Sequence, residues 1–402
     1  MKKLVSFQLT YKQLLSDLHQ AYLDARRHKR NKPYQLRFEA NLEHNLAELC
    51  LELWTRTYKP RPSTCFIITD PKKREVFAAE FRDRIVHHLY YNYVHEMLER
   101  TFIQDSYSCI KGRGTHYGIN RLDSHIRQES QNYTQPCWVL KLDIKGYFMH
   151  IDRQRLLRIT LSELERMSAH RISKHGTVRW RDRVDMDFVA YLSRVIILLN
   201  PVENCRVLGQ PEDWADLPHD KSLFHSAPGL GLPIGNLTSQ LFSNVYLNVF
   251  DQYMKRRLRL RHYGRYVDDA YVVSADRAFL REVVACVRTF LLEQLGLSLH
   301  EGKLRLCDVR QGVEFLGAFL KPWRRYVSNA TLRRMKPKIR RLATFTDRDR
   351  LLSTMNSLLG VLGHYCTLRL QRSLFPASLY AWLGLFKKNL LLKLTSPMSP
   401  PL

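Results

Sequence analysis

Alternating apolar and polar positions predict short strands in two parts of the chain. In residues 261–273, valines and tyrosines flank two adjacent acids, Asp268 and Asp269. Because Val and Tyr favour strands and Asp tolerates turn geometry, this pattern predicts a hairpin with both carboxylates at its tip. A second apolar run, 138–142, leads directly into Asp143. A solvated turn explains the two adjacent acids alone, but the third acid at a strand end favours a site.

Apolar residues at helical spacing predict helices in the remaining regions. The insert between the two acid-bearing segments, 153–228, shows two helical patterns, and a loop rich in turn residues closes it. A strand is expected over residues 64–68, after a Lys-Pro-Arg-Pro sequence that ends the preceding helix. The other helical regions are 9–54, 277–296 and the basic segment that starts near residue 330.

The charge of the chain indicates a polyanionic partner. Among 402 residues, 64 are Lys or Arg and 38 are Asp or Glu, which gives a formal net charge of +26. Nucleic acid is the natural partner of such an excess, and a basic ribosomal or membrane-surface protein is the alternative. Aromatic residues at 11% and hydrophobic residues at 45% favour a folded enzyme over a basic tail.

Cysteine usage and the absence of long apolar runs indicate a cytoplasmic protein without a membrane partner. The eight cysteines include no Cys-x-x-Cys pair, so the sequence supports neither a zinc site nor a redox motif. The residues after Met1 are too polar and too few for a signal peptide, and the apolar runs are too short to cross a bilayer.

The three acids predict a divalent-metal site. Mg²⁺ prefers carboxylate oxygens, and a pair of ions can stabilise both the attacking and the leaving oxygen of a phosphoryl transfer. Asp143 on one strand, placed beside Asp268 and Asp269 on a neighbouring hairpin, would build such a site.

These segments resemble motifs A and C of the reverse transcriptases, in which an acid on one strand lies beside Tyr-x-Asp-Asp on a hairpin. The resemblance implies an RNA-directed DNA polymerase with an α+β, right-hand polymerase fold of fingers, palm (antiparallel sheet plus helices) and helical thumb. It also implies that Asp143, Asp268 and the Ile144 carbonyl hold two Mg²⁺ ions, with Asp269 supporting the site. The primer 3′-hydroxyl then attacks the α-phosphate of a dNTP.

The same resemblance divides the chain into parts. The expected parts are an N-terminal helical extension 1–54, fingers 55–130, a palm 131–325 that contains the insert 153–228, a helical thumb 326–394 and a disordered tail 395–402.

Three further residues match functional positions of the family. Arg74 falls on its triphosphate-binding arginine, and a guanidinium suits phosphate oxygens. Phe148 falls on the aromatic steric gate that excludes a ribose 2′-hydroxyl. Lys303 matches the motif D lysine, a candidate general acid for the pyrophosphate leaving group. The simpler interpretations are an ordinary charge on a surface hairpin, a core aromatic and a surface lysine.

One motif resembles a particular group, the reverse transcriptases of diversity-generating retroelements. Most of the family has Gln-Gly-x-x-x-Ser-Pro where this chain has Ile234-Gly235-x-x-x-Ser239-Gln240. The match implies that Ile234, Gly235 and Gln240 line the dNTP site. Ile cannot form the hydrogen bond that Gln forms, so we expect weaker discrimination against mispairs.

This resemblance implies a template RNA from the retroelement, a cDNA primer and product, adenine-mutagenic copying, and a small basic accessory protein. Two alternatives stay open. One is a phage-defence reverse transcriptase that makes non-coding cDNA. The other is a non-enzymatic RNA-binding protein with a degenerate palm, against which the three intact acids argue.

Overall fold

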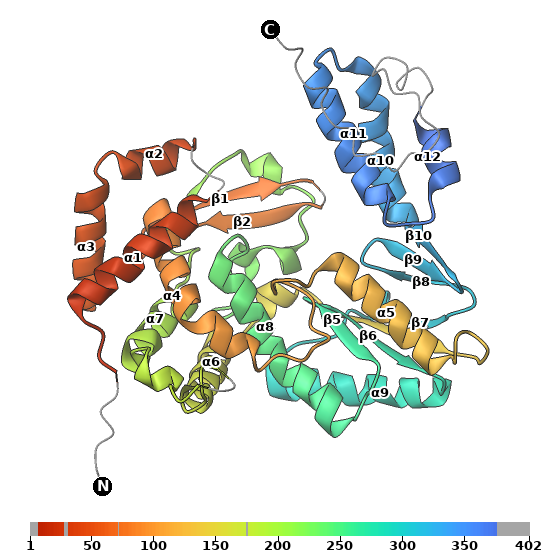
Figure 1. Ribbon diagram of the computed structural model, residues 1–402, viewed down its shortest axis with the longest axis horizontal. Helices are drawn as coiled ribbons and strands as arrows, with labels where there is room; N and C mark the ends of the chain where they lie inside the picture. The colour runs from red at the N-terminus through yellow and green to blue at the C-terminus, as the bar shows by residue number, and fades with distance from the viewer. Residues whose placement is uncertain (1–6, 28–30, 71, 174–175, 376–402) are drawn as a thin grey trace. The chain divides into compact units, whose positions relative to one another are not determined.

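The computed structural model describes residues 7–27, 31–70, 72–173 and 176–375 (Figure 1). The chain divides into two compact units: the first comprises Met1–Gly114, Lys141–Val272 and Ala278–Leu304, and the second comprises Thr115–Leu140, Val273–Arg277 and Arg305–Leu402. The expected tail 395–402, and the part of the expected thumb after residue 375, lie outside the described residues.

The first unit begins with three helices, α1 (Tyr11–Arg26), α2 (Pro33–Glu39) and α3 (Leu42–Trp54). The Thr10 side chain caps α1 by accepting a hydrogen bond from the Gln13 amide. Leu14, Leu18 and Ala21, spaced four and three residues apart, are fully buried on one face of α1. That face packs on α3 and on α4 (Phe81–Glu99), so the helices predicted in 9–54 are confirmed.

A three-stranded sheet lies beside these helices in the first unit. Strands β1 (Ser63–Ile68) and β2 (Arg74–Ala78) form an antiparallel hairpin, as Figure 1 shows. The third strand, β4 (Cys205–Val207), pairs in parallel with β1 and comes from the insert. The strand predicted over 64–68 is confirmed, whereas β4 was not predicted.

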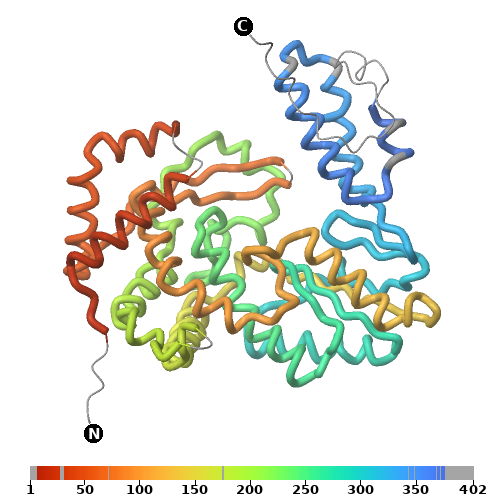
Figure 2. The backbone as a smooth tube through the Cα atoms, in the orientation of Figure 1, coloured from red at the N-terminus to blue at the C-terminus, as the bar shows by residue number. Residues whose placement is uncertain are grey.

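Three further helices of the first unit pack against α4. The two helical patterns of the insert are α6 (Arg153–Ser168) and α7 (Met186–Leu198), which lie side by side (Figure 2). Helix α8 (Leu237–Gln252) packs against α4 and α6 and is buried along most of its length. It continues into a π-helical turn, Tyr253–Arg257.

Four strands build the sheet that carries the acids. They are β3 (Trp138–Asp143), β5 (Tyr263–Tyr266), β6 (Asp269–Ser274) and β7 (Arg305–Asp308), in the order β5-β6-β3-β7. Helix α9 (Arg277–Phe290), which ends in a π-helical turn (Leu291–Leu295), buries Leu280, Val283 and Val287 at helical spacing. Mixed helices and antiparallel strands confirm the expected α+β polymerase fold class.

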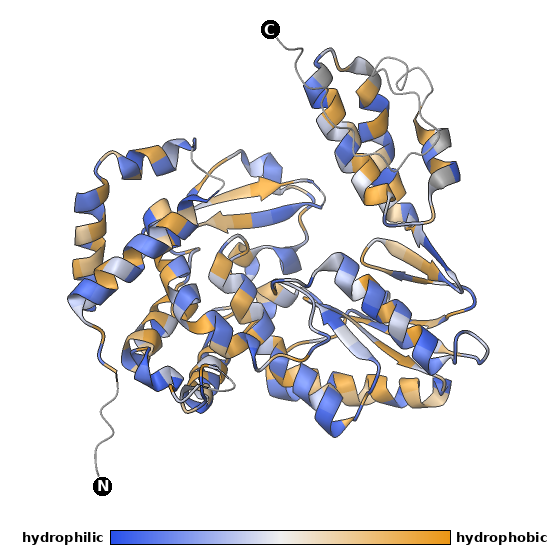
Figure 3. Ribbon diagram, viewed as in Figure 1, coloured by the Kyte–Doolittle hydropathy of each residue, from blue (hydrophilic) through white to orange (hydrophobic). Residues whose placement is uncertain are grey.

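The second unit contains α5 (Thr115–Glu129), an antiparallel sheet and three C-terminal helices. The sheet consists of β8 (Val313–Phe315), β9 (Ala318–Lys321) and β10 (Arg324–Val327). The helices are α10 (Asn329–Arg341), α11 (Arg348–Leu362) and α12 (Leu368–Leu374). Met335 and Ile339 of α10 are buried against α11, while the helix's basic residues stay exposed, so orange and blue segments alternate along it (Figure 3).

No helix in the described part of the chain is long and apolar enough to cross a membrane. None of the eight cysteines forms a disulfide.

Candidate active site

The predicted hairpin of adjacent acids is present. It consists of β5 and β6, with Asp268 in the turn and Asp269 at the first position of β6. Val267 adopts a left-handed backbone with φ of 54°, which is costly for a β-branched residue. Two hydrogen bonds hold it: Arg265 Nη1 donates to the Val267 carbonyl at 2.8 Å, and the Val267 amide donates to Ser108 Oγ at 3.2 Å.

A buried ion pair lies beneath this turn. Arg265 Nη2 lies 2.6 Å from Asp251 Oδ2 of α8, and the two side chains are 1% and 0% exposed. The Tyr263 hydroxyl also donates to Asp251, at 2.6 Å. Buried charges persist only when they are paired and hydrogen-bonded, so this network fixes the backbone that carries Asp268. The sequence did not predict a role for either charged residue; the one signal for Arg265 was its strand position two residues after Tyr263, on the same face.

Gly264 is explained by close packing at the same hairpin. The hydroxyls of Tyr107 and Tyr271 lie 2.7 Å apart, and a Cβ atom at Gly264 would collide with both. Glycine therefore allows the two tyrosines to stack behind the turn.

Asp143 ends β3, as predicted, and contacts Lys303. The Lys303 ammonium lies 2.7 Å from Asp143 Oδ2, and the His300 amide donates to the Asp143 carbonyl at 2.7 Å. Lys303 belongs to a 3₁₀ turn, Glu301–Lys303, whose Glu301 pairs with Arg288 at 2.8 Å. The structure thus brings the predicted Lys303 directly to one of the three acids.

Burial and nearby charges change the pKa values of Asp268 and Asp269. Burial, and next the Asp143 charge, raise the pKa of Asp268, while Lys303 and Arg74 lower it. Burial raises the pKa of Asp269 to about 6; Lys141 opposes this shift, and the other two acids add to it. A carboxylate whose charge raises the pKa of another must lie near it, so Asp143 lies near Asp268 and Asp269.

The donor chemistry suits a hard divalent cation. No three His, Cys, Asp or Glu side chains among the described residues form a complete metal-ligand cluster. Mg²⁺ does not need one, because it usually keeps several waters and uses one or two protein carboxylates together with substrate phosphates. Asp143 and Asp268 supply such carboxylates, and the cation would compete with the Lys303 ammonium for Asp143.

Phe148 and Ile234 meet at one apolar cluster. Phe148 lies in the 3₁₀ turn Tyr147–His150, and both side chains are partly buried against Cys65, Phe77 and Leu223. The Phe77 amide donates to the Ile234 carbonyl at 2.8 Å, which attaches the Ile234 loop to the edge of β2.

Gly235 occupies a position that excludes other residues. Its φ is 124°, and a Cβ atom there would lie 2.8 Å from Val76 Cγ1 and 3.1 Å from the Phe77 carbonyl. Asn236, which the sequence analysis did not single out, is buried and accepts a hydrogen bond from the Ala79 amide at 3.3 Å. Gln240 is exposed on the first turn of α8.

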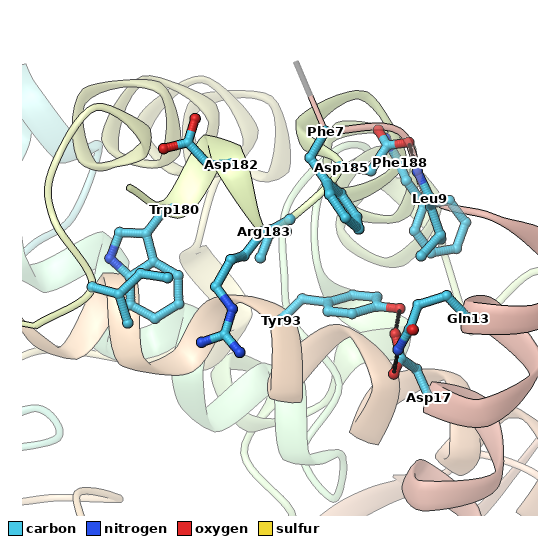
Figure 4. A pocket seen from close by; sticks show the side chains of 12 residues that line it. Phe7, Leu9, Gln13, Asp17, Tyr93, Trp180, Asp182, Arg183, Asp185 and Phe188 are labelled. Atoms are coloured by element: carbon cyan, nitrogen blue, oxygen red, sulfur yellow. Dashed lines mark hydrogen bonds between the residues drawn. The ribbon is translucent and has the colours of Figure 1, made fainter. Parts of the chain in front are cut away.

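A pocket of about 370 Å³ between α1, α4 and α7 contains none of the predicted site residues (Figure 4). Its acids have structural partners. Asp17 accepts a hydrogen bond from the Tyr93 hydroxyl at 2.7 Å, and Asp185 caps α7 and accepts from the Leu9 amide. We therefore interpret this pocket as packing around the N-terminal helices.

Part of the chain is similar to a known protein family. Residues 197–320, which include the Asp268–Asp269 hairpin, match the family described as reverse transcriptase (RNA-dependent DNA polymerase). The match indicates an RNA-directed DNA polymerase domain in that part of the chain.

Individual relatives are more distant. Protein YkfC of Escherichia coli K12 is 24% identical over 314 residues, which cover 69% of this chain and 72% of that protein. The solved telomerase of Candida albicans, bound to the TWJ fragment of telomeric RNA, is similar with a TM-score of 0.45 and 12% identity over 81% of this chain and 57% of that one. Apo telomerase of Candida tropicalis, truncated from its C-terminal domain, is similar with a TM-score of 0.45 and 10% identity over 66% of this chain and 54% of that one. The chain spans little more than half the length of these telomerase chains.

Proposed function

We propose that this protein copies a retroelement template RNA into cDNA, using dNTPs and two Mg²⁺ ions, with frequent errors opposite template adenine. The observation that carries the polymerase chemistry is the convergence of Asp143, Asp268 and Asp269 with Lys303 and Arg74. Carboxylates that repel one another beside two basic residues suit metal ions and a triphosphate.

Each residue of the site then has a role. Asp143, Asp268 and the Ile144 carbonyl hold the Mg²⁺ ions, and Asp269 supports them by its negative charge. The ions, when bound, stabilise charge on the attacking and leaving oxygens. Arg74 binds the triphosphate, and Lys303, released from Asp143, donates a proton toward the pyrophosphate.

A groove in the first unit supports binding of the template strand. It has a volume of about 770 Å³ and lies between helices α2 and α3 and the β2-β1-β4 sheet. Its lining contains more basic than acidic side chains, together with aromatic ones, a combination that binds phosphates and stacks on bases. They include Lys32, Tyr34, Arg37, Phe38, Arg61, Arg84 and Arg206.

The proposed error bias rests on Ile234. Its side chain is partly buried and aliphatic, in a loop attached to β2 near Phe148. Such a side chain offers no hydrogen bond to a nascent base pair, so geometry at this point is less constrained. The same resemblance to retroelement enzymes suggests a small basic accessory protein as partner.

Primer extension on poly(rA)/oligo(dT) tests the polymerase proposal. Asp268→Asn should abolish extension in Mg²⁺ while RNA affinity stays nearly intact, because affinity comes mostly from phosphate contacts elsewhere. Full extension by this variant would show that Asp268 is not a ligand of the catalytic metal ions.

Single-nucleotide misincorporation on an RNA template tests the error bias. We expect Ile234→Gln to lower the wrong-to-right ratio of kcat/KM more opposite adenine than opposite the other bases. An unchanged ratio in an active variant would exclude Ile234 from the mechanism. Equal error rates of the unmodified enzyme at all four template bases would instead favour the phage-defence alternative.

A further inference from the structure

Strand β2 carries a buried carboxylate, Glu75, whose hydrogen-bond donors all come from one segment that is distant in the sequence. Glu75 is 1% exposed. Its Oε2 accepts hydrogen bonds from Trp214 Nε1 and Ser222 Oγ, both at 2.8 Å, and its Oε1 accepts one from the Leu223 amide at 2.6 Å. All three donors belong to the end of the insert, about 140 residues away along the chain.

This segment, residues 205–226, is anchored along the whole hairpin; we call it the brace. Its strand β4 pairs with β1, and the Leu208 amide donates to the Cys65 carbonyl at 2.8 Å. Lys73, the residue before β2, donates to the Ala215 carbonyl. The brace therefore completes the sheet and covers the face of β2 on which Glu75 lies.

Arg74 lies on the opposite face of the same strand. Successive side chains of a strand alternate between faces, so hydrogen bonds that hold Glu75 on one side orient Arg74 on the other. Arg74 is exposed, and its charge reaches Asp268. Strand β2 therefore connects the buried Glu75 to Arg74, whose charge acts on Asp268.

The brace also contacts the Asp143 side of the site. A Cβ atom at Gly146, which has φ of 53°, would lie 2.7 Å from the Asp220 carbonyl of the brace. Leu223, whose amide binds Glu75, packs in the apolar cluster with Met149 and, at its edge, Phe148. One segment therefore touches both the strand of Arg74 and the turn that carries Phe148.

We propose that residues 205–226 position the nucleotide site, and that Glu75 is the positioning residue through which they orient Arg74 toward the triphosphate. This inference rests on the proposed function, because it takes Arg74 as a triphosphate ligand. It gives the end of the insert a role in nucleotide affinity rather than in folding alone.

A purely structural role makes a different prediction. A buried carboxylate with three donors contributes to stability wherever it lies, and its loss leaves donors unsatisfied. The test must therefore compare Glu75 with a similar carboxylate that does not adjoin Arg74. Asp83 serves: it is 2% exposed and accepts hydrogen bonds from the Tyr58 hydroxyl at 2.7 Å and the Arg61 amide at 2.9 Å.

The experiment is steady-state primer extension on poly(rA)/oligo(dT), with dTTP varied, for the full-length chain. For Glu75→Gln we expect KM for dTTP to rise about tenfold with kcat within about threefold and template affinity unchanged, as expected for lost substrate binding. Trp214→Phe removes one hydrogen-bond donor to Glu75 and keeps an aromatic ring, so it should raise KM less than Glu75→Gln does. It also tests the inference if the Glu75→Gln variant does not fold. Asp83→Asn, which changes a buried carboxylate away from Arg74, should leave KM for dTTP unchanged.

A double-mutant cycle with Arg74→Ala decides between the two roles. If Glu75 acts through Arg74, Glu75→Gln adds little to KM once Arg74 is gone; independent effects would multiply. Multiplying effects, or unchanged KM in both Glu75→Gln and Trp214→Phe, would overturn the inference while the polymerase stands. An inactive unmodified enzyme, or an Arg74→Ala variant with normal KM, would instead refute the proposed function.

Discussion

Asp269→Asn should stabilise the metal-free protein at neutral pH although it changes a residue of the proposed active site. Burial raises the pKa of Asp269 from 3.8 to about 6. The folded state therefore binds this proton more tightly than the unfolded state does. Between those two pKa values the free energy of unfolding falls as pH rises, and above pH 6 the full cost of the buried charge is present.

The size of the effect follows from the shift. The difference from 3.8 to 6 is 2.2 pH units, which at 1.36 kcal/mol per unit corresponds to about 3 kcal/mol. Asp269 keeps partial contact with solvent, so screening reduces the expected gain to about 1–2 kcal/mol. For domains of this size such a gain raises the unfolding temperature by about 2–8 °C.

Thermal unfolding in EDTA at pH 7.5 and at pH 4 measures this prediction. We expect Asp269→Asn to unfold at a higher temperature than the unmodified protein at pH 7.5, and the difference to shrink toward zero at pH 4, where Asp269 is protonated in the folded state. Glu282→Gln, which alters an exposed carboxylate on α9, provides the control. An Asp269→Asn variant that is less stable at pH 7.5, or equally shifted at both pH values, would refute the electrostatic argument.

Three further outcomes are expected. Phe148→Ala should raise the incorporation of ribonucleotides relative to deoxyribonucleotides by about tenfold or more, measured as the ratio of kcat/KM values, and an unchanged ratio would leave Phe148 as a core residue. Arg265→Ala should destabilise the first unit by about 3–5 kcal/mol in urea unfolding, because it strands the Asp251 charge; a small loss would mean that water reaches the pair. The logarithm of RNA affinity should fall linearly with the logarithm of salt concentration, by about 0.7 per phosphate contacted on a single strand, and a flat plot would assign the basic surface to another partner.

Local patterns were sufficient for the elements that bear the acids. The strand that ends on Asp143, the hairpin of Asp268 and Asp269, and the helices of the insert all depend on residues close together in the chain, where periodicity of two or 3.6 is visible. Strand β4 was not predicted, because a three-residue strand such as Cys205–Val207 has too few positions to show alternation. It forms only because β1 is available as a partner.

The contacts that hold the site in place could not be predicted in the same way. Glu75 and its donors, and Arg265 with Asp251, are pairs that only the folded chain brings together. From sequence alone, a charged residue in a strand is expected to face solvent when no partner lies near it in the chain. These residues are buried instead, and a buried charge must have specific donors or acceptors in place of water. The side chains that we propose to bind substrate were therefore easier to predict from the sequence than the side chains that hold them in position.

Two departures from local preference lie at the hairpin that carries the acids. Val267 has a left-handed backbone, and burial together with neighbouring carboxylates raises the pKa of both Asp268 and Asp269. Each feature costs stability, and each persists because a neighbouring network holds it, above all Arg265 beneath the turn. Left-handed backbones also occur far from this hairpin in the sequence, at Arg56, Leu316 and Trp323, so backbone strain alone does not mark a site. At the β5–β6 turn the strain coincides with buried carboxylates and a buried ion pair, and this combination supports the active site that we propose there.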